Sequence, residues 1–175
     1  PAFFTENQQA GISPYDNLTD KESAQIIVEH VANGVKLAEE NNLPVIIRDF
    51  ILTHHGHGMA KYFYIKYQNE HPDEIVDKEP FTYPGPNPYT REQAILMMAD
   101  SCEAASHSLK DYTEESISQM VNKIIDGQVE AGFFTEAAIT FRDISEAKSV
   151  LIDRLKAFYH TRITYPKLKR PSETH

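Results

Sequence analysis

The chain has 175 residues and is acidic, with 17 Lys and Arg against 26 Asp and Glu and a formal net charge of -9. A composition of 41% hydrophobic and 25% charged residues is typical of one globular domain with a sizeable core. The negative charge argues against a nucleic-acid polymer as partner, and the single cysteine, Cys102, excludes a disulfide within the chain. We expect Cys102 to fill the core.

Residues 1–17 show no sustained period and predict an irregular arm. Thr19 and Glu22 then form a capping-box pattern ahead of a helix over 20–40. The next helix is expected to begin at Pro44 and to end at Gly56. The stripes expected to face inward consist of Ile26, Ile27, His30, Val31, Gly34, Val35 and Leu37 in the first helix and of Val45, Ile46, Phe50 and Ile51 in the second.

An aromatic-rich segment over 59–67 is expected to be helical. Five prolines within 71–88 then predict a long loop that is stiff, because proline fixes its own φ and restricts the residue before it. A lining of a pocket and a plain surface crossing are equally good interpretations of the Tyr-Pro-Gly-Pro stretch at 83–86.

Three helices are expected in the second half, over about 90–109, 113–129 and 144–160. Capping boxes at Thr90 with Gln93 and at Asp143 with Glu146 mark two of their starts. The last helix is expected to bury Val150, Leu151, Leu155 and Phe158. Nothing alternates with period two for long enough to form a sheet, so the predicted class is all-α.

Histidines are the first candidates for chemistry. His30 replaces an apolar residue on an inward stripe, where a lone His is more often a hydrogen-bonded core residue than a ligand. His54, His55 and His57 follow at a helix end. One such His would normally interact with the last carbonyls, but three within four residues favour a metal, and His57 fits a surface position best.

Asp100 is the second candidate, because a carboxylate within so apolar a helix needs a metal or a cationic partner. Glu103, one turn further on, is either an outer partner of that site or simply solvated. The aromatic run that ends at Tyr64 could stack on a base, although such a stripe is usually core.

Several stretches resemble the cytoplasmic HD domain of the seven-transmembrane HD family of phosphohydrolases. These stretches lie at residues 4–8, 54–56, 81–88, 94–105 and 158–166. The resemblance implies an HD-domain-like helical bundle over 1–165, followed by a frayed basic tail over 166–175. It also implies hydrolysis of cyclic di-AMP to pApA at two divalent metal ions, with Mn or Fe favoured.

Carried over residue by residue, the resemblance places His30, His54 and His55 on one metal ion and Asp100 on the other. We expect Glu103 beside these ligands and Tyr64, Tyr83 and Gly85 at the substrate. The implied partners are a cyclic dinucleotide, a second copy of the chain as a possible homodimer, and the membrane. The membrane contact would come from a preceding part of the parent protein, on the cytoplasmic side, while this piece itself would be soluble.

The chain departs from the family pattern at its start. No His precedes His30, and only Asp16 and Asp20 precede it among aspartates, so the first His and the His-Asp dyad are missing. We therefore expect an N-terminally truncated domain that is inactive alone, and we assign no catalytic residue. The alternatives are an HD hydrolase for another nucleotide and a degenerate, non-catalytic helical binding module.

Overall fold

The computed structural model describes residues 18–160, and every regular element within this range is a helix. The predicted N-terminal arm and the basic tail lie outside the described residues, as do the family-like stretches 4–8 and 161–166. The all-α class is confirmed. In this range the helices are α1 (Asp20–Glu40), α2 (Val45–Thr53), α3 (Lys61–Glu70), α4 (Arg91–Ser106), α5 (Glu114–Glu130) and α6 (Phe141–His160), with the 3-10 turn η1 (Glu79–Phe81) between α3 and α4.

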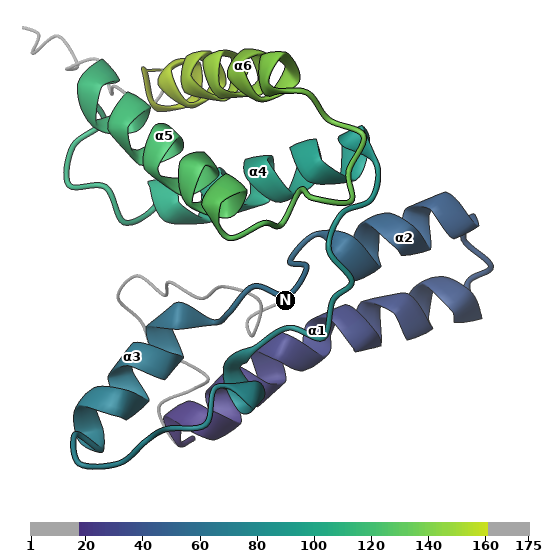
Figure 1. Cartoon of the computed structure of the whole chain (residues 1–175), viewed down its shortest axis with the longest axis vertical. Helices are drawn as coiled ribbons and strands as arrows, with labels where there is room; N and C mark the ends of the chain where they lie inside the picture. Colours follow the sequence, from purple (N-terminus) through teal and green to yellow (C-terminus); the bar gives the residue numbers. More distant parts are fainter. Residues whose placement is uncertain (1–17, 161–175) are drawn as a thin grey trace, which may run out of the picture.

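The helices form two lobes that follow each other along the chain (Figure 1). The α1–α3 lobe contains α1, α2, α3 and η1, and the α4–α6 lobe contains the last three helices. A tight turn at Asn42, whose φ of 54° asparagine tolerates better than most residues, folds α2 back along α1. Helix α2 also contacts α4, so it joins the two lobes.

Each lobe has its own apolar core. In the α1–α3 lobe, one face of α1 packs on Phe63 of α3 and on Phe81 and Tyr83. In the α4–α6 lobe, the large side chains of three helices interlock around fully buried residues, and Cys102 fills this core as expected. Burial raises the pKa of the Cys102 thiol to about 12, so this residue is no nucleophile. The fully buried members of this core include Met98, Cys102, Ile117, Val121 and Ile125.

Two of the three predicted capping boxes are confirmed. Thr19 and Thr90 accept hydrogen bonds from the third backbone N–H of α1 and α4, and the third residue of each helix reciprocates. The box predicted at Asp143 is wrong. Thr140 caps α6 instead, and Asp143 accepts from the Thr140 N–H at 2.9 Å, so α6 begins at Phe141, three residues earlier than predicted.

Other boundaries also shift. Pro44 lies just before α2 with an extended ψ of 145°, so the helix begins at Val45. Helix α3 begins at Lys61 rather than at 59, because the preceding residues pair with the loop around η1. Helix α4 ends at Ser106, short of the predicted 109.

The predicted inward stripes are partly wrong. Val45 and Ile46 are 60% and 62% exposed, because among the described elements only α1 and α4 contact α2, which leaves the rest of its surface uncovered. Leu37 is also exposed, and Ala38 is buried in its place. In α6 the inward side chains are Ile144, Leu155 and Tyr159, while Val150 and Phe158 face outward. Across the described residues, no helix combines the length and the apolar character that a bilayer crossing requires.

Candidate metal centre

The three family-type histidines come together where α1 and the end of α2 meet. His30 lies on α1, His54 caps the C-terminal end of α2, and His55 follows it. Gly34 allows the two helices to approach closely, because a Cβ there would lie 2.9 Å from a methyl of Ile51. Gly56, with a φ of +52°, then turns the chain away, which frees the adjacent imidazoles from strict helical directions.

The imidazole nitrogens converge on one point. Nε2 of His30 lies 3.1 Å from Nε2 of His54, and one ring nitrogen from each of the three residues lies within 4.8 Å of the others. Two nitrogens bound to one ion at about 2.1 Å are roughly 3.0–3.4 Å apart for bond angles of about 90–109°. The predicted convergence of His30, His54 and His55 is therefore confirmed, and its spacing suits a shared ion.

Backbone carbonyls orient two of the three rings. Nδ1 of His30 contacts the carbonyl of Ile27, and Nδ1 of His54 lies 2.7 Å from the carbonyl of Ile51. A carbonyl can only accept, so each Nδ1 carries the proton and each Nε2 keeps its lone pair. This is the usual outer support of a metal-binding histidine.

The surroundings also keep the rings of His54 and His55 neutral. Burial lowers the pKa of His54, against the carbonyl of Ile51 and the charge of Asp100, which raise it. Burial, followed by the neighbouring imidazoles of His54 and His30, lowers the pKa of His55 to about 2. Neutral imidazole is the form that binds a metal ion, so the donor set fits a divalent transition metal.

Comparison with known proteins points the same way. The chain is 40% identical over 166 residues to the cyclic-di-AMP phosphodiesterase PgpH of Listeria monocytogenes and 36% identical over 167 residues to that of Bacillus subtilis. Each alignment covers 95% of this chain. The crystal structure of the L. monocytogenes PgpH HD domain in complex with cyclic-di-AMP superposes with a TM-score of 0.83 at 39% identity, over 91% of this chain and 73% of that chain.

The chain belongs to the PgpH HD-domain family. No family model matches the sequence. The chain spans only 23% of the length of the two full-length PgpH relatives.

Asp100, the other ligand predicted for this HD domain, lies close to the three histidines but outside their group. Its Oδ2 is 3.7 Å from Nδ1 of His55, beyond hydrogen-bond distance. Its side chain is 41% exposed, so this carboxylate is only partly buried. Partial burial still raises the pKa of Asp100, opposed by the nearby His54. The carboxylate thus faces the site from the α4–α6 lobe.

Of the remaining predicted residues, Tyr83 and Gly85 lie beside histidines of the 54–57 turn, whereas Glu103 and Tyr64 pair with other residues. Tyr83 stacks on His55, with ring centroids 4.2 Å apart. Gly85 lies under the ring of His57, where any Cβ would collide with the imidazole. Glu103 is exposed and accepts from His107 at 2.8 Å, which favours the solvated interpretation. Tyr64 packs edge-on against a core phenylalanine, which favours the core interpretation over a substrate contact.

Sequence reasoning missed Asn87. Its side-chain oxygen accepts the backbone N–H of His57 at 2.9 Å and so holds the histidine turn from across the proline-rich loop. No spacing or periodicity in the sequence links these two residues.

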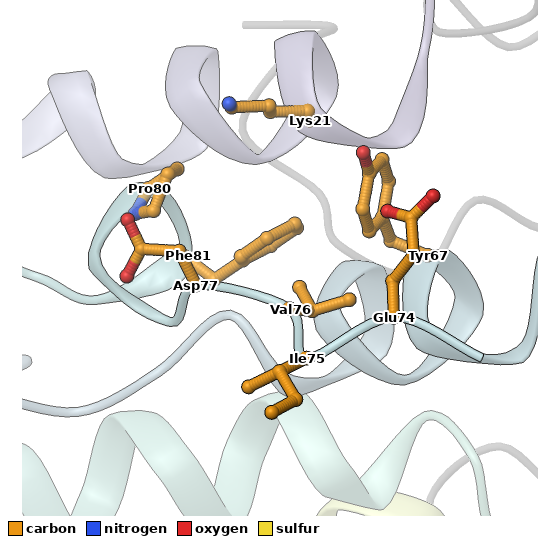
Figure 2. Close-up of a pocket in the computed structure, with 8 residues that line it drawn as sticks. All are labelled: Lys21, Tyr67, Glu74, Ile75, Val76, Asp77, Pro80 and Phe81. Carbon is orange, nitrogen blue, oxygen red and sulfur yellow. The ribbon is translucent and has the colours of Figure 1, made fainter. Parts of the chain in front are cut away.

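A hollow of the described surface lies apart from the histidines. A cavity of about 100 Å³ opens between the start of α1, the end of α3 and η1, and Figure 2 shows Lys21 and Tyr67 on two of its sides. The residues around it are Lys21, Tyr67, Glu74, Ile75, Val76, Asp77, Pro80 and Phe81. None of the predicted site residues lines this cavity.

Proposed function

We propose that this chain is the metal-binding part of an HD phosphodiesterase that hydrolyses cyclic di-AMP to pApA. The observation that carries the proposal is the convergence of His30, His54 and His55. The Nε2 atoms of His30 and His54 lie 3.1 Å apart. The relatives named cyclic-di-AMP phosphodiesterase and the neighbour bound to cyclic-di-AMP support this substrate.

A divalent ion, Mn or Fe by the nature of its ligands, would supply positive charge to a phosphoryl oxygen and lower the pKa of a bound water. The residues of this chain hold and prepare the site. His30 and His54 present unprotonated Nε2 atoms because their Nδ1 protons go to backbone carbonyls. Three protein ligands leave positions open for water and substrate, as in other catalytic metal sites.

We assign Asp100 to a second ion beside the first. Its carboxylate faces His55 from the other lobe, and its partial exposure leaves room for further ligands on its open side. Within the described residues, the three imidazoles and Asp100 offer fewer donors than a pair of ions needs. The missing donors, which the family resemblance gives as an earlier His and a His-Asp dyad, would come from elsewhere in a longer, membrane-tethered parent.

We therefore expect this chain alone to hydrolyse cyclic di-AMP slowly or not at all. The test compares it with a longer form that includes upstream sequence, in the presence of Mn²⁺, by following pApA formation. The longer form should be active and should lose activity on His54→Ala. Equal rates from both forms would contradict the ligand assignment. Cleavage of other nucleotides with cyclic di-AMP left intact would show that the substrate is a different nucleotide.

A non-catalytic binding module is the second candidate, favoured by the small number of donors in the described residues. It predicts that the longer form also leaves cyclic di-AMP intact while still binding it. A homodimer is a further expectation of this proposal, supported by the exposed apolar side chains Val45 and Ile46 on α2.

A further inference from the structure

The segment 81–87 is fastened to the chain directly after the histidine pair. The Tyr83 N–H donates to the carbonyl of Gly58 and the Ala60 N–H donates to the carbonyl of Phe81, both at 2.8 Å. Asn87 accepts from the His57 N–H at the other end of the segment. The loop and the histidine turn therefore form one unit, held by backbone bonds that do not depend on the identity of the side chain at 83.

In this fixed position, the ring of Tyr83 stacks on the ring of His55. The two rings are nearly parallel, with an interplanar angle of 18° and centroids 4.2 Å apart, and the other edge of Tyr83 meets His30 in a T-shaped contact at 5.9 Å. Tyr83 is only 4% exposed and belongs to the core of the α1–α3 lobe. A side chain so enclosed offers little surface to a substrate, but it forms a rigid wall for the imidazole.

The three histidines differ in what fixes them. His30 and His54 are held by the carbonyls of residues three positions earlier. Within the described residues, the ring of His55 makes no such bond to a carbonyl, and its approach to Asp100 is 3.7 Å. The terminal torsion of histidine is broad, so a ring without a hydrogen-bonded anchor needs packing to define its plane.

We propose that Tyr83 is a positioning residue for the metal centre, whose aromatic face holds the plane of His55 so that the third imidazole is in place before the ion binds. The proposal rests on the metal site of the proposed function. The Tyr83 ring would orient His55 as the backbone carbonyls orient His30 and His54. In this role Tyr83 would not bind the substrate.

The experiment measures Mn²⁺ affinity of the chain by calorimetric titration and the visible spectrum of its Co²⁺ form. Tyr83→Leu keeps the apolar volume but removes the flat face, and it should weaken Mn²⁺ binding by about 10- to 100-fold, the range for outer supports of metal ligands. Tyr83→Phe keeps the face and should bind within about twofold of the parent chain. The Co²⁺ bands should shift in Tyr83→Leu and stay in place in Tyr83→Phe.

Tyr159→Leu is the matched control, because Tyr159 is also a buried, stacked tyrosine but belongs to the α4–α6 lobe. It should destabilise the fold and leave Mn²⁺ affinity unchanged. If Tyr83→Leu does not fold, Asn87→Ala loosens the same segment from the surface side and should weaken Mn²⁺ binding by about tenfold.

The outcomes separate the two proposals. Parent-like Mn²⁺ affinity and Co²⁺ spectrum in a folded Tyr83→Leu chain would overturn the positioning role alone. A rise in KM for cyclic di-AMP in the longer form, with unchanged Mn²⁺ affinity, would return Tyr83 to substrate binding. A parent chain that binds no Mn²⁺ would overturn the metal site itself.

Discussion

Among the described residues, the α4–α6 lobe buries more large apolar side chains completely than the α1–α3 lobe does. In the α4–α6 lobe, Met98, Ile117 and Ile125 are fully buried by helices of the same lobe. In the α1–α3 lobe, α2 leaves Val45 and Ile46 largely in solvent. The histidines lie in this second, more open lobe, at the end of its least covered helix. Asp100 faces the histidines from the α4–α6 lobe. Substitutions in the buried core of that lobe and substitutions of the histidines should nevertheless have separable effects, on stability and on metal binding.

The largest effect is expected from removing a metal ligand in the open lobe. His54→Ala should weaken Mn²⁺ binding by more than the roughly 100-fold upper figure for outer supports, because it removes a donor nitrogen itself. The helix content should stay unchanged in circular dichroism. His107→Ala, which removes a surface histidine of α4 paired with Glu103, is the control and should bind Mn²⁺ normally. Equal losses from both variants would contradict the assignment.

Core truncation should distinguish the lobes by stability. Ile125→Ala empties a fully buried site and should lower the free energy of unfolding by about 3 kcal/mol. Ile46→Ala, the same change at an exposed site of α2, should cost about 0.5 kcal/mol or less. Urea denaturation measures both. A large, concentration-dependent cost for Ile46→Ala would show instead that a second copy covers α2.

Lowering the pH should reduce the free energy of unfolding of the metal-free protein, because of the buried histidines in the α1–α3 lobe. The pKa of His55 is about 2 when folded against an ordinary 6.5, so below about pH 6.5 the unfolded chain binds a proton that the folded chain excludes. The free energy of unfolding should therefore fall with falling pH, by at most about 1.4 kcal/mol per pH unit from this residue. His54, whose pKa is also lowered, acts in the same direction.

Urea denaturation at pH 7.5, 6.5 and 5.5 without metal tests this dependence. Replacing His55 by Gln should flatten it. Asp100, whose pKa is raised, acts in the opposite direction, because the folded carboxyl keeps its proton to a higher pH than the unfolded one. An unchanged slope in His55→Gln would contradict the burial of a neutral imidazole.

The smallest effect is expected from removing one helix cap in each lobe. Thr19→Ala and Thr90→Ala each remove a side-chain oxygen that caps α1 or α4 and should each cost about 1 kcal/mol. If the lobes unfold together, both variants shift one common transition. A thermal transition that splits for one variant would show that the lobes unfold separately.

Local signals in the sequence predicted most helices because the interactions that start and end them are local. The boxes at Thr19 and Thr90 and the turn at Gly56 each involve residues within one helical turn, and all three are present. The box predicted at Asp143 failed because Thr140 offers a competing cap three residues earlier.

Burial was predicted less well because it depends on the other lobe. Val45 and Ile46 carry the same apolar pattern as a covered helix, but among the described elements only α1 and α4 contact α2, and these side chains stay exposed. For the site, His54 and His55 could be found from their spacing at a helix end, whereas His30 was assigned through the family resemblance. The stacking of Tyr83 on His55 and the bond from His57 to Asn87 could not, since they join distant parts of the chain.

The most direct test of the central claim is a crystal structure of the chain grown with Mn²⁺, with anomalous data collected at the manganese edge. We expect one anomalous peak at about 2.1–2.2 Å from a ring nitrogen of each of His30, His54 and His55. A peak bound by only one of the three, or the absence of any peak there at saturating Mn²⁺, would contradict it.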